Sequence, residues 1–387
     1  MMKNPVLKIS IFNSVYKFFR ESTTFFLAMY LVQIGLSGGQ IGIVFALANL
    51  TGIIATLPSG IINDKIRSKH LISLAILFVA MQFVGISNYH SFLIVLILFL
   101  LGGIGKTLFS ISMDSLFYKS SGKKDSPMKI ATMLMPNYLM LGAGTILTGY
   151  LINFQINFEQ LFLIIGILLA ILSVIGLIIL PKSATANLSI LDYKNSMSDP
   201  KAIFLLTIMS LFAIHFGAED TSYGLFLKTN LGLNPNQMGI YMGTAIMVMG
   251  FSVLWIGKNF SKIKVKNLLL YGLFLSGTFH ILMTIQNPYI SWSMRVIHEI
   301  GDSMMFFALL FGISQLFDEK KYGGLTGIFT FSMVISATFG AFIFGYIGGN
   351  FGYNVPIIIG GLTTLIAFII TCKFTHLIHE EHRPNRS

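Results

Sequence analysis

Ionisable side chains lie inside long apolar segments of this 387-residue chain. A charge in the apolar interior of a bilayer is costly, so such a residue usually faces water, pairs with another charge, or does both. Many of these residues follow one another at steps of three or four, which places them on one face of a helix. They form four groups, at Lys17, Arg20 and Glu21; at Lys106; at His215, Glu219, Asp220 and Tyr223; and at Arg295, His298, Glu299 and Asp302.

Two kinds of chemistry fit these groups. Cationic and polar side chains bind anionic or zwitterionic organic solutes, and the residues predicted to contact a solute are Lys17, Arg20, Glu21, Lys106, Tyr223 and Arg295. Imidazoles titrate near neutral pH and can exchange protons together with carboxylates, and the residues predicted to do so are His215, Glu219, Asp220, His298, Glu299 and Asp302. The alternative is a static network of ion pairs that holds the helices together.

A metal site is a third reading of the same segments. His215 with Glu219, and His298 with Asp302, have the i, i+4 spacing of ligand pairs on a helix. The cations close by oppose a divalent ion. We therefore expect no metal ligands and no cofactor.

The composition places these groups in a membrane protein. Hydrophobic residues make up 54% of the chain and charged residues 11%, against about 25% charged in a typical soluble domain. With one cysteine, Cys372, the chain has no disulfide framework within it and no cysteine-rich metal site. This composition excludes a soluble globular protein.

Segments long enough to cross a bilayer account for most of the chain, since a spanning helix needs roughly 20 apolar residues. Twelve are predicted, at 9–35, 40–62, 70–88, 91–118, 128–153, 158–180, 201–228, 236–257, 267–286, 289–316, 323–348 and 353–375. We expect an all-α integral membrane protein of two six-helix bundles, 1–181 and 201–376, joined by a cytoplasmic linker at 182–200 and followed by a cytoplasmic tail at 377–387. Lys17, Arg20 and Glu21 exclude a cleaved signal peptide at the first segment.

The net charge of +11 reflects basic residues that gather on one side of the membrane. With the N-terminus inside, 21 of the 26 Lys and Arg residues fall on the cytoplasmic side or at helix ends there, as the positive-inside rule requires. We therefore expect a multi-pass protein of the cell membrane (the inner membrane, where there are two), with both termini cytoplasmic. A nucleic-acid partner is excluded, because no basic domain exists to bind one.

The two halves of the chain repeat. At an offset of 197, Gly35, Ser37 and Gln40 fall on Gly232, Asn234 and Gln237; at 196, Gly105, Gly144 and Gly149 fall on Gly301, Gly340 and Gly345. Such duplication is typical of transporters with a solute site between pseudo-symmetric halves. The same alignment makes Lys106 the counterpart of Asp302. We therefore expect these two residues to line facing walls of one cavity. The wall formed by the N-terminal half would be mainly basic, and the wall formed by the C-terminal half mainly acidic.

The loop Gly60-Ile61-Ile62-Asn63-Asp64-Lys65-Ile66-Arg67-Ser68-Lys69 resembles the cytoplasmic signature of the major facilitator superfamily (MFS), departing from it at Arg67 and Ser68. The resemblance extends over the whole chain and implies the MFS fold. It also implies a conformational gate at Gly60, Asp64, Lys65 and Arg67, with Asp114 as its acidic partner. Signatures of the family's drug antiporters are incomplete: Phe99 replaces an Arg, and no Pro follows Gly142, Gly144 and Gly149.

The resemblance implies a monomeric secondary active transporter rather than an enzyme. We expect it to couple protons to the movement of a small polar, anionic or zwitterionic organic solute, with efflux of a drug or metabolite favoured. Three alternatives stay open: an importer of a carboxylate-rich solute such as a siderophore, a lysophospholipid transporter, and a membrane sensor without flux. The expected partners are the solute, protons and the lipid bilayer.

Overall fold

The computed structural model describes residues 5–121, 127–182, 200–316, 322–374 and 377. Within the helices, the side chains at 57, 60, 61, 64, 65, 118, 121, 312–316 and 322–327 fall outside that description. The predicted linker at 182–200 and tail at 377–387 lie almost entirely outside the described residues. In the described part every regular element is helical and no strand occurs, as the apolar composition predicts for a protein that must satisfy its backbone inside lipid.

The helices follow the predicted spans closely. They are α1 (Pro5–Arg20), η1 (Glu21–Thr23), α2 (Thr24–Gln33), α3 (Gly38–Lys65), α4 (Ser68–Ile86), α5 (Phe92–Ser121), α6 (Pro127–Asn153), α7 (Phe158–Ile179), α9 (Pro200–Ala218), η3 (Glu219–Tyr223), α10 (Gly224–Thr229), α11 (Pro235–Asn259), η4 (Phe260–Lys262), α12 (Val265–Leu282), α13 (Pro288–Leu316), α14 (Tyr322–Phe351) and α15 (Asn354–Lys373).

Ten of the twelve predicted spans are, within the described residues, helices long and apolar enough to cross a membrane. In the other two, three charged residues lie close together. The first is divided into α1 and α2 by η1, and α13 carries Arg295, Glu299 and Asp302 within two turns. Charged residues inside spanning helices mark a polar site within the membrane.

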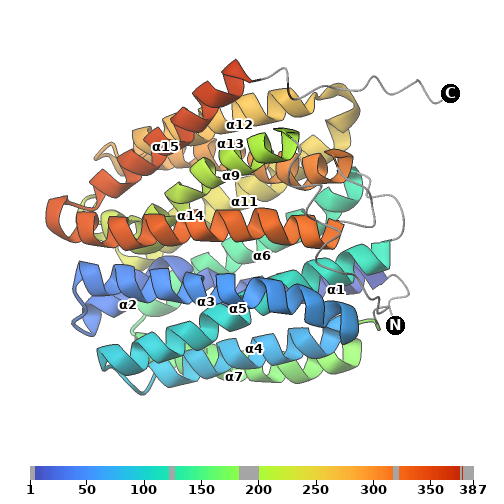
Figure 1. Cartoon of the computed structure of the whole chain (residues 1–387). Coiled ribbons are helices and arrows are strands. Elements are labelled where there is room, and N and C mark those ends of the chain that lie inside the picture. The colour runs from blue at the N-terminus through green and yellow to red at the C-terminus, as the bar shows by residue number, and fades with distance from the viewer. Residues whose placement is uncertain (1–4, 122–126, 183–199, 317–321, 375–376, 378–387) are drawn as a thin grey trace.

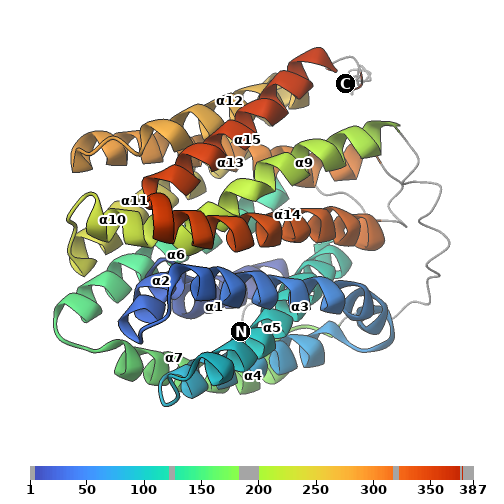
Figure 2. The same ribbon diagram turned by 60° about the vertical axis from the view of Figure 1, so that its left-hand side comes forward.

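Helices α1 to α7 lie together, as do α9 to α15; we call these sets the N-terminal half and the C-terminal half (Figures 1 and 2). The halves meet where α3 packs on α14 and α6 packs on α11. Helices α4 and α7 form one outer edge, and α12 and α15 the other. The two ends of the chain lie at the same end of the molecule (Figure 1).

Apolar side chains fill the interior of each half and also cover its outside. Buried residues such as Phe83 and Phe162 pack in the N-terminal half, and Phe212 and Phe307 in the C-terminal half. Ile178 on α7 and others like it, including Leu93, Val174 and Ile369, are exposed. Contiguous exposed apolar surface of this kind is what lipid contact requires.

The repeat read from the sequence appears as repeated local structure. Gly35 and Gly232 both have positive φ, 90° and 65°, a conformation that glycine adopts without strain. Ser37 and Asn234, two residues further on, both form complete capping boxes with Gln40 and Gln237. Equivalent glycines therefore end one span, and equivalent polar residues start the next, in each half.

The contacts between the halves are also equivalent. A Cβ on Gly345 of α14 would lie 2.5 Å from the Cα of Gly42 on α3, and one on Gly149 of α6 would lie 2.8 Å from the Cα of Gly239 on α11. Gly42 and Gly239, like Gly149 and Gly345, are repeat-related. Helix backbones thus touch directly at two matching places, where the starts of α3 and α11 pass the ends of α14 and α6.

Candidate functional site

A cavity of about 200 Å³ lies inside the N-terminal half, between α1, η1, α5 and α6. Two cations, Lys17 and Lys106, and two carboxylates, Glu21 and Asp114, line it. We call it the N-half cavity; its other lining residues are Asn13, Tyr16, Phe109, Ser110, Met113, Met133, Leu134, Asn137, Tyr138 and Leu141. A lining with charges of both signs is complementary to a solute that carries both signs.

The charges of the first span pair within that span. Glu21 accepts a hydrogen bond from Arg20 Nη1 at 2.7 Å, and its other oxygen lies 3.9 Å from Lys17 Nζ. The i, i+4 contact between Lys17 and Glu21 is the one that their spacing predicts. Arg20 is buried and lines a second, smaller cavity, to which Asp220 of the C-terminal half also contributes.

Asp220 and Glu219 point in different directions although they are neighbours. Asp220 lines a small cavity of about 30 Å³ together with Arg20 and Lys106 of the N-terminal half. Glu219 points into its own half and pairs with Arg295. Both stand at the start of η3, a π-helical turn that interrupts the seventh span. Turns of this kind widen a helix and are frequent at functional sites, and a regular helix had been expected here.

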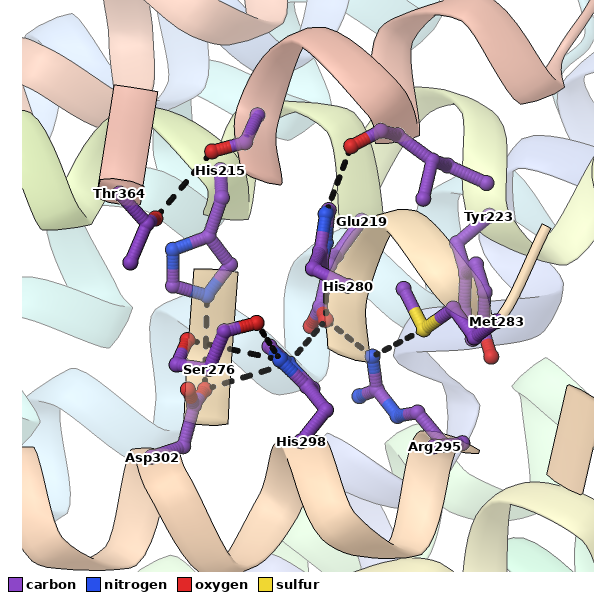
Figure 3. Close-up of polar contacts among 12 residues, drawn as sticks. His215, Glu219, Tyr223, Ser276, His280, Met283, Arg295, His298, Asp302 and Thr364 are labelled. Carbon is purple, nitrogen blue, oxygen red and sulfur yellow. Dashed lines mark hydrogen bonds and ion pairs between the residues drawn. The ribbon is translucent and has the colours of Figure 1, made fainter. Parts of the chain in front are cut away.

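Arg295 is the charged centre of the C-terminal half. Its Nη1 pairs with Glu219 Oε1, and its Nη2 lies 2.6 Å from Glu299 Oε1. The guanidinium carbon lies 4.7 Å from the ring centroid of Tyr223, within reach of a cation–π contact. Figure 3 shows Arg295 and Glu219 directed at each other between α13 and the seventh span.

Three buried histidines surround the same carboxylates. We call His215, His280 and His298, with Glu219 and Asp302, the histidine cluster. His298 Nε2 lies 3.3 Å from Glu219 Oε1 and 3.5 Å from Asp302 Oδ2; His215 Nε2 lies 3.4 Å from Asp302 Oδ2, and His280 Nε2 lies 3.7 Å from Glu219 Oε1. Figure 3 shows the three rings turned toward these carboxylates.

In each of these rings, the Nδ1 atom contacts a backbone carbonyl oxygen on the side away from the carboxylates. His280 Nδ1 lies 2.7 Å from the Ile357 oxygen and His298 Nδ1 lies 2.9 Å from the Ser276 oxygen, while His215 Nδ1 contacts the Phe212 oxygen. A carbonyl oxygen only accepts hydrogen bonds, so each Nδ1 carries a proton. The Nε2 atoms, which face the carboxylates, have no hydrogen-bond partner among the described residues.

The histidine cluster contains two sets of potential metal ligands. They are His215, His298 and Asp302, and Glu219, His280 and His298; within each set the ligand atoms lie within 4.8 Å of one another. From the sequence, the nearby cations were an argument against a metal ion, but in the structure they do not pair equally with all the carboxylates. Arg295 pairs with Glu219 and Glu299, whereas the ion pairs of Asp302 within the described residues are with histidines.

The predicted site residues lie in three places: the N-half cavity, the C-terminal half, and the small cavity that Arg20 and Asp220 share. Lys17, Glu21 and Lys106 line the N-half cavity, while Tyr223, Arg295, Glu299 and the histidine cluster lie in the C-terminal half. Charges were expected to face one another across a single cavity; instead they pair mostly within each half. Asp302 contacts His215 and His298, and the acid that meets Lys106 at the interface is Asp220.

The predicted gate is only partly described. Gly60, Asp64 and Lys65 belong to the last turns of α3, and their side chains lie outside the described part. Arg67 is exposed just before α4. Asp114, expected as the acidic partner of the gate, lines the N-half cavity. The gate stays a prediction, as does proton exchange by the six residues chosen for it.

Two buried groups were missed from the sequence. His280, which was not among the predicted site residues, belongs to the histidine cluster. Tyr241 on α11 accepts a hydrogen bond from the hydroxyl of Tyr223 at 3.1 Å and lies 2.7 Å from Ser291 Oγ. Tyr241 lies in a span without charged neighbours, so only the three-dimensional structure brings it to the site.

Two pseudo-symmetric helical halves with buried charges inside are the architecture of a membrane transporter. The Major Facilitator Superfamily model matches residues 9–275 and 205–387. The chain belongs to the major facilitator superfamily, whose members are transporters and not enzymes, and this confirms the resemblance found in the sequence. In sequence it is similar to the quinolone resistance protein NorA of Staphylococcus aureus, with 22% identity over 315 residues, 79% of this chain and 80% of NorA.

Solved structures share the fold at low sequence identity. The nucleoside transporter NupG superposes with a TM-score of 0.76 at 15% identity, covering 97% of this chain and all of that chain. The human organic anion transporter MFSD10 superposes with a TM-score of 0.70 at 12% identity, covering 95% and 99%. A bacterial homologue of the human lysosomal transporter Spinster, in an inward-facing and occupied conformation, gives 0.72 at 14% identity, covering 98% of each chain. At these identities the likeness concerns the fold alone.

Proposed function

We propose that the protein is a proton-coupled secondary transporter that moves a small zwitterionic or anionic organic solute by alternating access, with export favoured. The observation that carries this proposal is the N-half cavity. It lies within a transporter fold, and Lys17, Lys106, Glu21 and Asp114 line it. Membership of the superfamily supports transport of a small solute.

The arrangement of charges supports a solute with charges of both signs. Lys17 and Lys106 can bind a carboxylate or phosphate group, and Asp114 can bind an amine. Arg20, Lys106 and Asp220 meet where the halves touch. A solute that binds the N-half cavity therefore lies beside the interface that must move in alternating access.

The cavity volume supports a small solute. At about 200 Å³ it is below the 300 to 1,000 Å³ or so of pockets for drug-sized ligands. A siderophore or a lysophospholipid would require a much wider cavity than this one. A drug-sized solute would require the cavity to widen during the transport cycle.

The direction of transport is proposed from similarity and topology. The similar NorA protein is a quinolone resistance protein, and a transporter gives resistance by carrying a toxic solute away. With both termini in the cytoplasm, the N-half cavity, which is lined by the later part of α5 and the earlier part of α6, lies toward the inner end. An exporter loads its solute from that side.

Flux in proteoliposomes tests this proposal. We expect a pH gradient to drive accumulation of a zwitterionic quinolone or a zwitterionic amino compound, with simple carboxylates moved more slowly and simple amines least. Lys106→Gln and Asp114→Asn should each lower the rate by about tenfold or more, the effect of losing a buried charged contact worth 1.5–3 kcal/mol. Lys228→Gln, at an exposed lysine at the end of α10, is the matched control.

Three results would contradict the proposal in different ways. Flux that persists without a pH gradient would remove proton coupling but keep transport. Equal rates in the two cavity variants and the control would move the solute site elsewhere. Binding of a solute with no flux under any gradient would make the protein a sensor.

A further inference from the structure

We propose that the histidine cluster is a binding site for one divalent transition-metal ion, zinc in the first place, with His215 Nε2, His298 Nε2 and an oxygen of Asp302 as ligands. This inference goes beyond the proposed function, because it concerns the C-terminal half alone. It begins with three nitrogen atoms that are buried, lack hydrogen bonds among the described residues, and point at two carboxylates.

The proton positions call for a cation among the rings. Each Nδ1 is protonated because it faces a carbonyl, so in a neutral ring the lone pair of Nε2 points at a carboxylate oxygen. Two electron-rich atoms facing each other in a buried site repel unless a proton on Nε2 or a metal ion lies between them, and the lack of hydrogen-bond geometry at these Nε2 atoms favours the metal ion. Histidines that bind metals show this same arrangement, in which the second ring nitrogen donates to a carbonyl or carboxylate and fixes the ring.

The distances fit a metal better than hydrogen bonds. An N–H···O bond spans about 2.7–3.2 Å, whereas His215 and His298 Nε2 lie 3.4 and 3.5 Å from Asp302 Oδ2. Zinc ligands lie about 2.0–2.2 Å from the ion in a tetrahedron, which separates them from one another by roughly 3.3–3.6 Å. The two distances from Asp302 Oδ2 to the histidines therefore already match a tetrahedral ion, and the two Nε2 atoms lie within 4.8 Å of each other.

The neighbouring charges select the ligand set. Asp302 contacts no arginine or lysine among its ion pairs in the described residues, and its Oδ1 has no hydrogen-bond partner there. Glu219 pairs with Arg295, and its distance to His280 Nε2 is 3.7 Å. The set of His215, His298 and Asp302 thus binds the ion, with Glu219 within reach of the fourth position through its 3.3 Å contact with His298.

The ligand chemistry selects the class of ion. Imidazole nitrogens with a carboxylate suit zinc and neighbouring transition metals, whereas calcium and magnesium prefer oxygen ligands alone. All proposed ligands come from the seventh span and α13 of one half, and none is more than 4% exposed at the side chain. An ion held by one half does not cross the interface, so it is a resident of the C-terminal half and not the transported solute.

Metal binding to the purified full-length protein tests the proposal. The protein should carry no affinity tag, and His376→Ala, His379→Ala and His382→Ala remove the histidines of the C-terminal tail from the measurement. We expect calorimetry to give one Zn²⁺ per chain, with a raised Tm, and Co²⁺ to give the strong visible absorption of a tetrahedral site. His215→Gln, His298→Gln and Asp302→Asn should each weaken Zn²⁺ binding by about 100-fold or more, since each removes a direct ligand of a tetrahedral site.

Two matched variants sharpen the result. His70→Gln, at an exposed histidine of α4, should leave binding unchanged. His280→Gln should weaken it by about tenfold, the effect of losing a supporting contact. If His280→Gln abolishes binding while His215→Gln retains it, the proposed ligand set is wrong.

X-ray absorption spectroscopy of the zinc-loaded parent protein tests the ligands directly, so its result does not depend on whether any variant folds. Scattering from two imidazoles at about 2.0–2.1 Å is expected; a shell of oxygen atoms without imidazole, or no bound zinc, would overturn the proposal. Because binding is measured in detergent and flux in chelator-treated vesicles, failure of this inference leaves the proposed transport function standing, and the reverse also holds.

Discussion

Arg295 shows how one residue can hold a buried polar site together. Its guanidinium contacts Glu219 and Glu299 at the same time and lies over the ring of Tyr223. A planar group with several fixed donors can serve two carboxylates, which the point charge of a lysine cannot. Removing one partner from such a group leaves uncompensated buried charge, whose cost exceeds the net contribution of the intact pair.

Arg295→Met should therefore destabilise the protein strongly. We expect the loss to be about 3–5 kcal/mol, the range for breaking a buried ion pair from one side, measured as a fall in Tm of the purified protein. Adding Glu219→Gln and Glu299→Gln to Arg295→Met should restore part of the Tm, because no unpaired charge remains. A triple variant less stable than the single one would contradict this account; Arg67→Met, at an exposed arginine, is the control.

Asp220 should matter for transport more than for stability. It is partly buried and meets Arg20 and Lys106 across the interface, so its attraction exists only while the halves are close. Asp220→Asn should lower the flux by about tenfold, since coupling between moving parts is typically worth 1–3 kcal/mol, while Tm changes little. Asp220→Glu should retain most of the flux, and a Tm loss as large as that of Arg295→Met would assign Asp220 a structural role.

Contacts between side chains of one helix could be predicted from the sequence better than contacts between side chains of different helices. Lys17 and Glu21 meet because an i, i+4 spacing brings them together on any helix. Glu219 and Asp220 could not be assigned partners, because their partners depend on which helices pack on η3. His280 looked isolated for the same reason: its neighbours come from α13 and the seventh span.

The interrupted helices and the close helix pairs are the elements that most concern movement. The first span of each half breaks beside its charged residues, at η1 and at η3. Broken spans beside a binding site are typical of transporters, because unwound turns free backbone groups and redirect side chains. Sequence patterning found both spans but neither break, since a single tight or wide turn leaves the hydropathy of a span unchanged.

Gly345→Ala should disturb the contact of α3 with α14. The added Cβ would lie 2.5 Å from the Cα of Gly42, and backbone cannot yield as a flexible side chain does. We expect a loss of about 1–3 kcal/mol, as for other overpacked contacts, seen as a lower Tm together with slower flux. The control is Gly39→Ala on α3, where an added Cβ meets nothing within 4 Å; equal effects of the two variants would show that the contact is unimportant.

At the scale of the whole molecule, the fold could be predicted because the bilayer imposes it. Spans need a minimum apolar length and a bilayer-crossing backbone must be helical, so composition and hydropathy fix the number and type of elements. The repeat then indicated how the halves are related, through residues such as Gly35 and Gly232. Which charges meet which could not follow from these rules, because one rotation of a helix changes every contact and leaves its hydropathy the same.

Orientation in the membrane can be tested with the natural cysteine. Cys372 is exposed near the end of α15, on the side that the positive charges predict to be cytoplasmic. A membrane-impermeant maleimide should label it in inverted vesicles or permeabilised cells and leave it unlabelled in intact cells. Labelling of intact cells would reverse the predicted orientation, and Cys372→Ser is the control for background.

The glycine contacts between the halves bear on how readily the molecule can change state. At Gly42 with Gly345, and at Gly149 with Gly239, a Cβ added to any of the four glycines would first meet backbone atoms of the facing helix. Such points leave no side chain of their own to repack when the helices separate, whereas further along α6 and α11 side chains such as Ile146 and Met247 take part in the contact. Because the two contacts are related by the repeat, we expect one rocking motion of the halves against each other, about an axis in the plane of the membrane, to separate both contacts together.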